Sequence, residues 1–148
     1  GRPENAGCYC SVNSFLKETI SVLAEEFDYV IIDGEAGIEQ VNRRVMEKVT
    51  HLLLVSDASK KGIGVIHTIR DVAMELGMYN RAGAIINRIK NETVRNMVDT
   101  GDIEVLSFIP EDETLGLMDI EGRSLLELNE SALSLKGLRE ALVQINVI

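Results

Sequence analysis

Short apolar runs alternate along the chain with longer segments in which apolar residues recur every three or four positions. The short runs are rich in β-branched residues, as is typical of strands buried on both faces of a sheet. These predicted strands are 29–32, 51–55, 82–86 and 104–109. The longer segments have the period of amphipathic helices. These predicted helices are 11–27, 40–49, 62–76, 92–99, a turn within 111–120, and a last one from 129 or 131 to 146.

Alternating strands and helices indicate an α/β fold, with a mostly parallel sheet flanked by helices and joined by right-handed crossovers. No repeat, low-complexity tract or linker divides the sequence, so we expect residues 1–148 to form a single domain. Several side chains are expected in or near its core, including those on the inner face of the helix over 62–76, which Gly77 would cap. They are Met46, Val65, Ile66, His67, Ile69, Val72, Ala73, Met74, Leu76, Met78 and Met97.

The apolar run Tyr29–Ile32 ends abruptly at Asp33, and two glycines follow within four residues. This pattern predicts a carboxylate at the carboxyl end of a central strand, where open α/β sheets bind their ligands. An aspartate there can hold the water shell of Mg²⁺, and the small Ala36–Gly37 step lets backbone N–H groups approach a phosphate. An ordinary turn after a strand is the alternative interpretation.

Two further strand ends carry polar residues. Asn87 and Arg88 follow one predicted strand, and an asparagine amide both donates and accepts hydrogen bonds, which suits the edge of a purine base. Pro110 and Glu111 follow the next strand and suit another wall of a base pocket. The alternatives are a turn at Asn87 and a helix start after Pro110.

Cys8 and Cys10 are the two cysteines of the chain and are spaced C-x-C. A disulfide across one intervening residue would be strained, and two thiolates do not complete a four-ligand site for a soft metal. A second copy of the motif across a two-fold axis would supply four sulfurs, and hence a metal site in a homodimer. The alternative is a pair of ordinary loop or buried cysteines.

Composition narrows the class of protein. Hydrophobic residues at 45% and charged residues at 26% are typical of a soluble globular domain. The net charge of −9 argues against a general nucleic-acid role, and aromatic residues at 4% argue against a base-stacking surface. No apolar run reaches the roughly 20 residues that span a bilayer, so we expect no membrane partner.

Together these motifs resemble those of a known family. The stretch Asp33-Gly-Glu-Ala-Gly-Ile-Glu39 resembles the second nucleotide motif, D-x-x-A-G-I-E, of the MinD/ParA-like P-loop ATPases. Asn87-Arg88 looks like their adenine-contacting asparagine, and Ile109-Pro-Glu-Asp112 like the segment that flanks the base. The N-terminal Gly1-Arg-Pro-Glu4 and Gly7-Cys-Tyr-Cys10 more narrowly resemble the CooC-type accessory ATPases, which help insert nickel into carbon monoxide dehydrogenase.

The resemblance implies a cytoplasmic homodimer that sandwiches ATP and Mg²⁺, with paired C-x-C motifs binding Ni²⁺ or Zn²⁺ at the interface and carbon monoxide dehydrogenase as client. It implies that Asp33 lies in the magnesium water shell and that Gly37 lies near the terminal phosphate. The nucleotide-binding residues that it implies are Asn87, Arg88, Pro110 and Glu111.

One part of the family's pattern is absent. The sequence contains no G-x-x-x-x-G-K-[ST] motif and no Lys-Gly-Gly variant of it. In the family this P-loop lies on the first strand, which would precede Gly1. The sequence therefore predicts the C-terminal part of such an ATPase, without its first strands and inactive by itself.

Other functions remain open at this stage. One is a non-catalytic metal-binding dimerisation module that keeps the C-x-C motif. Another is a different MinD/ParA-like ATPase. A phosphoacceptor receiver domain is disfavoured, because it needs an acidic pair at the end of an earlier strand and only a loop and one helix precede Asp28.

Overall fold

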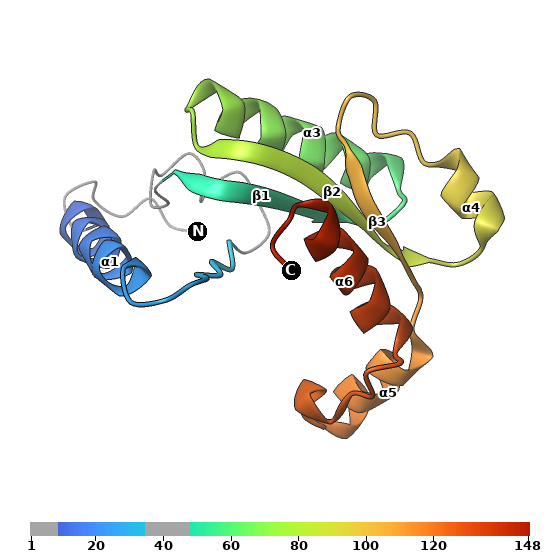
Figure 1. Ribbon diagram of the computed structural model, residues 1–148. Coiled ribbons are helices and arrows are strands. Elements are labelled where there is room, and N and C mark those ends of the chain that lie inside the picture. The colour runs from blue at the N-terminus through green and yellow to red at the C-terminus, as the bar shows by residue number, and fades with distance from the viewer. Residues whose placement is uncertain (1–8, 35–47) are drawn as a thin grey trace.

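The computed structural model describes residues 9–34 and 48–148. Within them, three parallel strands form one sheet in the order β1-β2-β3, namely β1 (Val49–Ser56), β2 (Tyr79–Ile89) and β3 (Val105–Pro110). Helix α3 (Lys60–Glu75) covers one face of the sheet and α6 (Leu133–Gln144) covers the other (Figure 1). The predicted α/β fold with a parallel sheet and flanking helices is confirmed.

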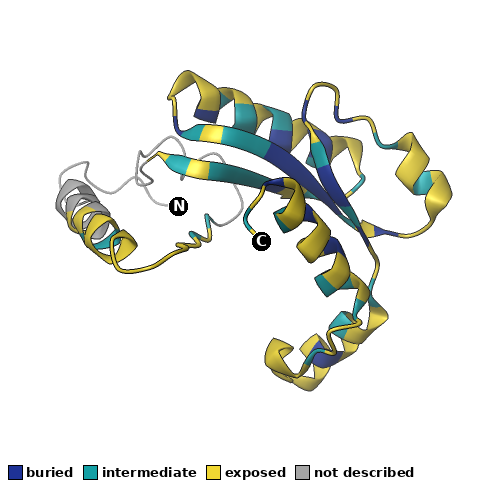
Figure 2. Cartoon of the chain, viewed as in Figure 1, coloured by how far each residue is buried: buried dark blue, intermediate teal, exposed yellow. Residues whose placement is uncertain are grey.

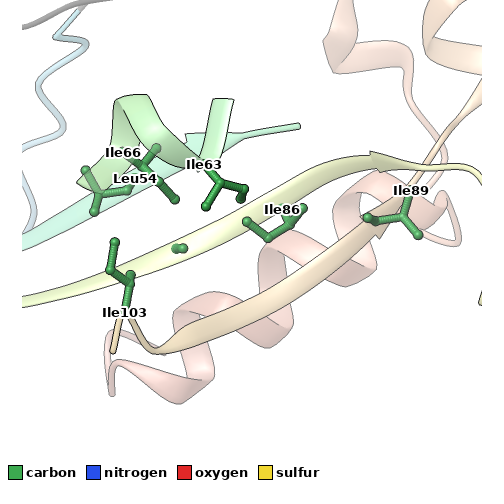
Figure 3. Packing of buried hydrophobic residues seen from close by; sticks show 7 residues of the cluster. Leu54, Ile63, Ile66, Ile86, Ile89 and Ile103 are labelled. Atoms are coloured by element: carbon green, nitrogen blue, oxygen red, sulfur yellow. The ribbon is translucent and has the colours of Figure 1, made fainter. Parts of the chain in front are cut away.

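The main core lies between the sheet and α3, where seven residues are buried (Figure 3). They are Leu54, Ile63, Ile66, Ala84, Ile86, Ile89 and Ile103. On β2, Ala84 and Ile86 contribute to this core, whereas Ile85 between them packs on the opposite face against α6. The unbroken apolar run of β2 is thus explained by burial on both faces.

The second core lies beneath α6 and contains Ile85, Leu106, Ile109, Ala141 and Ile145. Gly137 lets α6 approach the sheet closely, since a Cβ atom there would lie 2.7 Å from Cγ1 of Ile109. Burial is therefore concentrated in β2, β3 and the inner sides of the two covering helices (Figure 2).

The remaining elements lie around this layered centre. Helix α1 (Tyr9–Ala24) lies apart from the sheet, while α4 (Glu92–Met97) joins β2 to β3 (Figure 1). After β3 come α5 (Glu113–Glu121) and the 3₁₀ turn η1 (Leu125–Glu127), which lead into α6. Within the described residues, no helix is both long enough and apolar enough to cross a membrane.

The predicted strand 29–32 is wrong. Residues 29–32 are extended but pair with no strand in the described part of the chain, and Tyr29, Val30 and Ile31 are 64%, 45% and 95% exposed. A strand buried on both faces requires hydrogen-bonded neighbours, which the sheet β1-β2-β3 does not give this segment. A long-range hydrogen bond connects this segment to the C-terminus: the hydroxyl group of Tyr29 donates to the carbonyl oxygen of Val147 at 2.8 Å.

Some expected core residues are also on the surface. Met74 and Met97 are 59% and 79% exposed, and Val65 and Leu76 are exposed as well, whereas Met78 is buried as predicted. Successive helix residues point about 100° apart, so the neighbours of the buried Ile66 and Ala73 turn away from the sheet. His67 is half-buried.

The ends of two elements differ from prediction, and the end of α3 agrees with it. Strand β2 continues to Ile89, so Asn87 and Arg88 lie inside the strand, near its end, and do not follow it. Gly77 has the left-handed φ of +63° expected just beyond the end of α3. The predicted helix 40–49 lies outside the described residues up to 47, together with Met46, and Val49 begins β1 instead.

Candidate functional site

The carboxyl ends of the three parallel strands meet at one edge of the sheet. Ser56 at the end of β1 is in register with Ile86, and Pro110 at the end of β3 is in register with Ile89. The loop after β1, the Asn87–Arg88 pair and the segment after Pro110 therefore lie at the same edge. Polar groups at this edge are well placed to bind a ligand in an open α/β sheet.

The loop from β1 to α3 is closed by a compact hydrogen-bond network. Asp57 Oδ1 accepts hydrogen bonds from the backbone N of Ser59 at 3.0 Å and from its Oγ at 2.6 Å. Ser59 Oγ in turn accepts from the backbone N of Gly62 at 3.0 Å, which caps the start of α3. A Cβ atom on Gly62 would lie 2.4 Å from Ser56 Oγ, so only glycine lets the loop fold so closely over the helix.

These contacts affect the charge of Asp57. The hydrogen bonds from the Ser59 side chain and backbone lower the pKa of Asp57, and the positive charge of Arg88 lowers it further. The Asp57 carboxyl group therefore stays ionised more readily than usual, and the positive charge of Arg88 at the end of β2 contributes to this. Sequence reasoning gave Asp57 and Ser59 no role, although an Asp and a Ser around a helix start are a recognisable capping signal.

Asn87 and Arg88 form an irregular bend within β2. Arg88 has a φ of +58°, a left-handed conformation that is uncommon for a residue with a side chain. Asn87 Oδ1 accepts a hydrogen bond from the backbone N of Arg88 at 2.8 Å, and the pairing with β3 shifts register between Ile86 and Ile89. Strain of this kind costs about 1–3 kcal/mol and is concentrated at functional sites. Asn87 is half-buried and Arg88 is exposed, so both can meet a ligand at this edge.

The segment after β3 is held from two sides. The backbone N of Glu111 donates to the carbonyl oxygen of Ile89 at 3.0 Å, which joins the ends of β2 and β3. Asp112 caps α5 by accepting from the backbone N of Thr114 at 3.1 Å, and it also accepts from Ser134 Oγ at 3.0 Å. Burial raises the pKa of Asp112, but the hydrogen bonds from Ser134 and Thr114 lower it more, and the net shift is downward.

The alternative interpretation of this segment as a helix start is therefore correct for Asp112. Pro110 and Glu111 are exposed at the same edge, and their proposed contact with a base stays a prediction.

The other predicted site residues lie in or near the N-terminal part. Asp33 is exposed at the end of the extended segment, and Gly37 lies outside the described residues. Cys8 also lies outside them, and Cys10 is in the first turn of α1. In the described ranges 9–34 and 48–148, no group of three or more His, Cys, Asp or Glu residues could hold a metal ion. The C-x-C metal site stays a prediction.

The chain was compared with known proteins. No family model matches it. It is 33% identical over 135 residues to an uncharacterized ATP-binding protein of Methanocaldococcus jannaschii, covering 88% of this chain and 53% of that protein. It is 27% identical over 127 residues to the carbon monoxide dehydrogenase accessory protein CooC of Rhodospirillum rubrum, covering 84% of this chain and 48% of CooC. The chain therefore spans about half the length of these curated relatives.

Solved structures give the same fold. The MinD cell division protein of Aquifex aeolicus superimposes with a TM-score of 0.74 at 19% identity, covering 90% of this chain and 60% of that one. The cell division ATPase MinD of Pyrococcus furiosus gives a TM-score of 0.69 at 21% identity, covering 90% and 58%. At this level of identity the likeness concerns the fold alone.

Proposed function

We propose that the chain is the C-terminal part of an ATPase of the MinD/ParA-like P-loop class and contributes the base-binding edge of the nucleotide site. The observation that carries the proposal is the strained Asn87–Arg88 bend, which lies at the carboxyl edge of the sheet beside the capped loop at Asp57. The similarity to an ATP-binding protein of M. jannaschii supports the choice of ligand.

The described residues fit one portion of an ATP molecule. The Asn87 amide is half-buried, and its Oδ1 is oriented by the backbone N of Arg88, so the side chain is fixed as a base-contacting group would need to be. Pro110 and Glu111 are exposed on the neighbouring strand end and would form a wall beside the base.

The phosphates require residues of another kind. Asp33 would hold the water shell of Mg²⁺, and Gly37 would present its backbone N–H to the terminal phosphate. When bound, Mg²⁺ would neutralise charge on the phosphate oxygens. The P-loop glycines and lysine that complete such a site do not occur in this sequence. In the proposed ATPase, a segment outside this sequence would supply them.

The finer proposal is that the protein acts as an accessory ATPase in nickel insertion, with carbon monoxide dehydrogenase as its client. The similarity to CooC of R. rubrum and the C-x-C motif support this proposal. Cys8 and Cys10 would each supply a thiolate to Ni²⁺ or Zn²⁺, and the partner copy in a homodimer would supply the other two.

A second candidate is a metal-binding dimerisation module without hydrolysis. The C-x-C motif of Cys8 and Cys10 favours it. The two candidates differ in one measurable property, since the module would bind metal whether or not nucleotide is present, and the ATPase would couple the two.

Hydrolysis and nucleotide binding test the proposal together. We expect the chain of 148 residues alone to hydrolyse MgATP at the background rate, because the donors around the β- and γ-phosphates are missing. Extending the chain by the reading frame that precedes Gly1 should produce ATP binding and turnover, and Asp33→Ala in this longer protein should abolish turnover. Turnover by the 148-residue chain that Asp33→Ala removes would contradict the proposal. So would a longer protein that binds no nucleotide.

A further inference from the structure

A cavity of about 420 Å³ is lined by residues of β3 and α6, and Pro110 is the lining residue that also lies at the carboxyl edge described above. Strand β3 is an edge strand of the described sheet, and α6 packs alongside it (Figure 1). Every second backbone N–H and C=O group of an edge strand points away from the sheet. A strand edge with a helix beside it is the arrangement that protein domains use to bind an extended peptide as an added strand.

A buried polar atom lies in this cavity. Ser107, in the middle of β3, is 6% exposed and lines the cavity, and its Oγ has no hydrogen-bond partner among the described residues. Buried hydroxyl groups are nearly always hydrogen-bonded, because leaving one unpaired costs free energy. The Ser107 hydroxyl thus indicates that the cavity receives a polar group.

The charge around the cavity is favourable to an anionic occupant. Arg95 of α4 and Lys136 of α6 line it, and Glu140 is the acidic residue among the lining groups. Arg95 also forms an ion pair with the exposed Glu92 at 3.5 Å, and an acidic segment would compete for this contact. The Arg95 guanidinium lies 5.0 Å from the ring centre of Phe108, which holds it over β3. These two cations are notable in a chain whose net charge is −9.

We propose that the groove between β3 and α6 binds an extended acidic segment of a partner protein, which adds to the edge of β3 as a further strand. Backbone groups of residues 105–109 pair with the segment, and the Ser107 hydroxyl donates to one of its polar groups. Carboxylates of the segment pair with Arg95 and Lys136. The groove lies on the far side of β3 from β2 and shares one residue, Pro110, with the proposed ATP-binding residues, whereas Arg95, Ser107 and Lys136 belong to the groove alone.

The experiment uses the full chain and a defined probe. Uniformly ¹⁵N-labelled protein is titrated with an acetylated, amidated octapeptide of alternating Glu and Val, and amide shifts and hydrogen exchange are followed. We expect the largest shifts at Val105, Ser107 and Phe108, with slower amide exchange in β3. The same peptide with N-methyl groups on its valines should not bind, because it lacks the backbone donors that strand addition requires. A Lys/Val octapeptide should not bind either.

Variants locate the charge contacts. Arg95→Glu and Lys136→Glu should each weaken binding of the Glu/Val peptide at least tenfold. The matched control is Lys48→Glu, which alters an exposed lysine just before β1, at the other edge of the described sheet, and should leave binding unchanged. Ser107→Ala should weaken binding severalfold. Circular dichroism establishes that each variant is folded, and the N-methyl comparison needs no variant.

Three results would overturn the proposal. The first is the absence of shifts in β3 at millimolar peptide. The second is equal binding of the N-methylated peptide, or the same shifts with inorganic phosphate, either of which would make the cavity a simple anion site. The third is that β3 amides become protected on raising the protein concentration alone, which would make the groove a contact between two copies of the chain.

Discussion

Arg88 and Asp57 come from different strand ends, and the positive charge of Arg88 contributes to the lowered pKa of the Asp57 carboxyl group. The left-handed backbone of Arg88 and the capping network around Asp57 are therefore parts of one charged edge.

The first prediction concerns stability and pH. The folded pKa of Asp57 is below the ordinary value of 3.8, so its stabilising contribution is complete above that value and is lost as the pH falls through the folded pKa. We expect Asp57→Asn to lower the free energy of unfolding at pH 7 and to have a much smaller effect near pH 2. Urea unfolding at the two values measures this difference. An effect of Asp57→Asn that is equal at both values would contradict the role of the charge.

Ser59 provides the companion variant. Ser59→Ala removes the hydroxyl that caps α3 and should cost about 0.5–2 kcal/mol. Unlike the effect at Asp57, most of this loss should persist at low pH, because a hydroxyl does not titrate.

The second prediction concerns the packing of α6. Gly137→Ala places a Cβ atom 2.7 Å from Cγ1 of Ile109, and overpacking of this kind costs about 1–3 kcal/mol. Alanine regains about 1 kcal/mol in helix propensity, so we expect a net loss of up to about 2 kcal/mol. Gly64→Ala in α3 is the matched control, because a Cβ atom there meets nothing within 4 Å. That variant should stabilise the protein by about 0.5–1 kcal/mol. If the two substitutions changed the free energy of unfolding equally in urea, α6 would be able to move away from Ile109 without cost.

The third prediction concerns base recognition in the chain extended upstream of Gly1. Asn87→Ala should weaken ATP binding by about 1–3 kcal/mol and relax the preference for adenine over guanine. Isothermal titration with ATP and GTP gives both quantities. If the affinity for ATP and the preference for adenine were both unchanged, Asn87 would have only a structural role in the bend.

Arg88→Gly separates strain from binding in the same protein. Glycine adopts a positive φ without steric cost, so this variant should unfold no more easily than the parent, although it removes the Arg88 charge. Weakened ATP binding in a protein of undiminished stability would assign the strain at Arg88 to function. A clear loss of stability would instead assign Arg88 a structural role.

The fourth prediction concerns the C-x-C motif. Reduced protein titrated with Ni²⁺ should bind one metal per two chains, become a dimer and show a thiolate-to-metal charge-transfer band. Binding releases thiol protons, so affinity should fall as the pH drops below the thiol pKa of about 8.5. Cys8→Ser and Cys10→Ser should each abolish the band and the metal-induced dimer, as followed by absorbance and mass. One metal per chain, or a dimer indifferent to both substitutions, would contradict a shared site.

Strands β1, β2 and β3 were predictable because their apolar residues are buried by contacts that the sequence pattern itself implies. The run at Tyr29–Ile32 has the same pattern and yet forms no strand in the described structure. The hydrophobic pattern of a segment indicates which side chains it can bury. Whether the segment pairs as a strand depends on which other strands lie next to it in the fold. Residues 29–32 thus have the composition of a strand, but no neighbouring strand in the described part of the chain pairs with them.

The position of the candidate residues in the fold was predictable, and the details of their geometry were less so. Parallel strands imply a common carboxyl edge, and Asn87, Arg88, Pro110 and Glu111 do lie there. The left-handed φ of Arg88 coincides with a register shift between β2 and β3, which no local sequence signal encodes. Met74 was misplaced because it lies next to the buried Ala73 on α3 and points away from the sheet, and Met97 was misplaced because α4 has no buried residues.

The extended segment between α1 and β1 has a consequence for how the protein behaves at high concentration. Residues 29–32 are uncharged, rich in β-branched side chains and largely exposed, which are the properties of segments that nucleate aggregation. Asp28 and Asp33 border this run on its two sides, and charges in such positions hinder the stacking of exposed strands. The aspartate proposed to serve magnesium would then also keep the protein dispersed, so that Asp33→Ala would be expected to lower the solubility of the chain along with its chemistry.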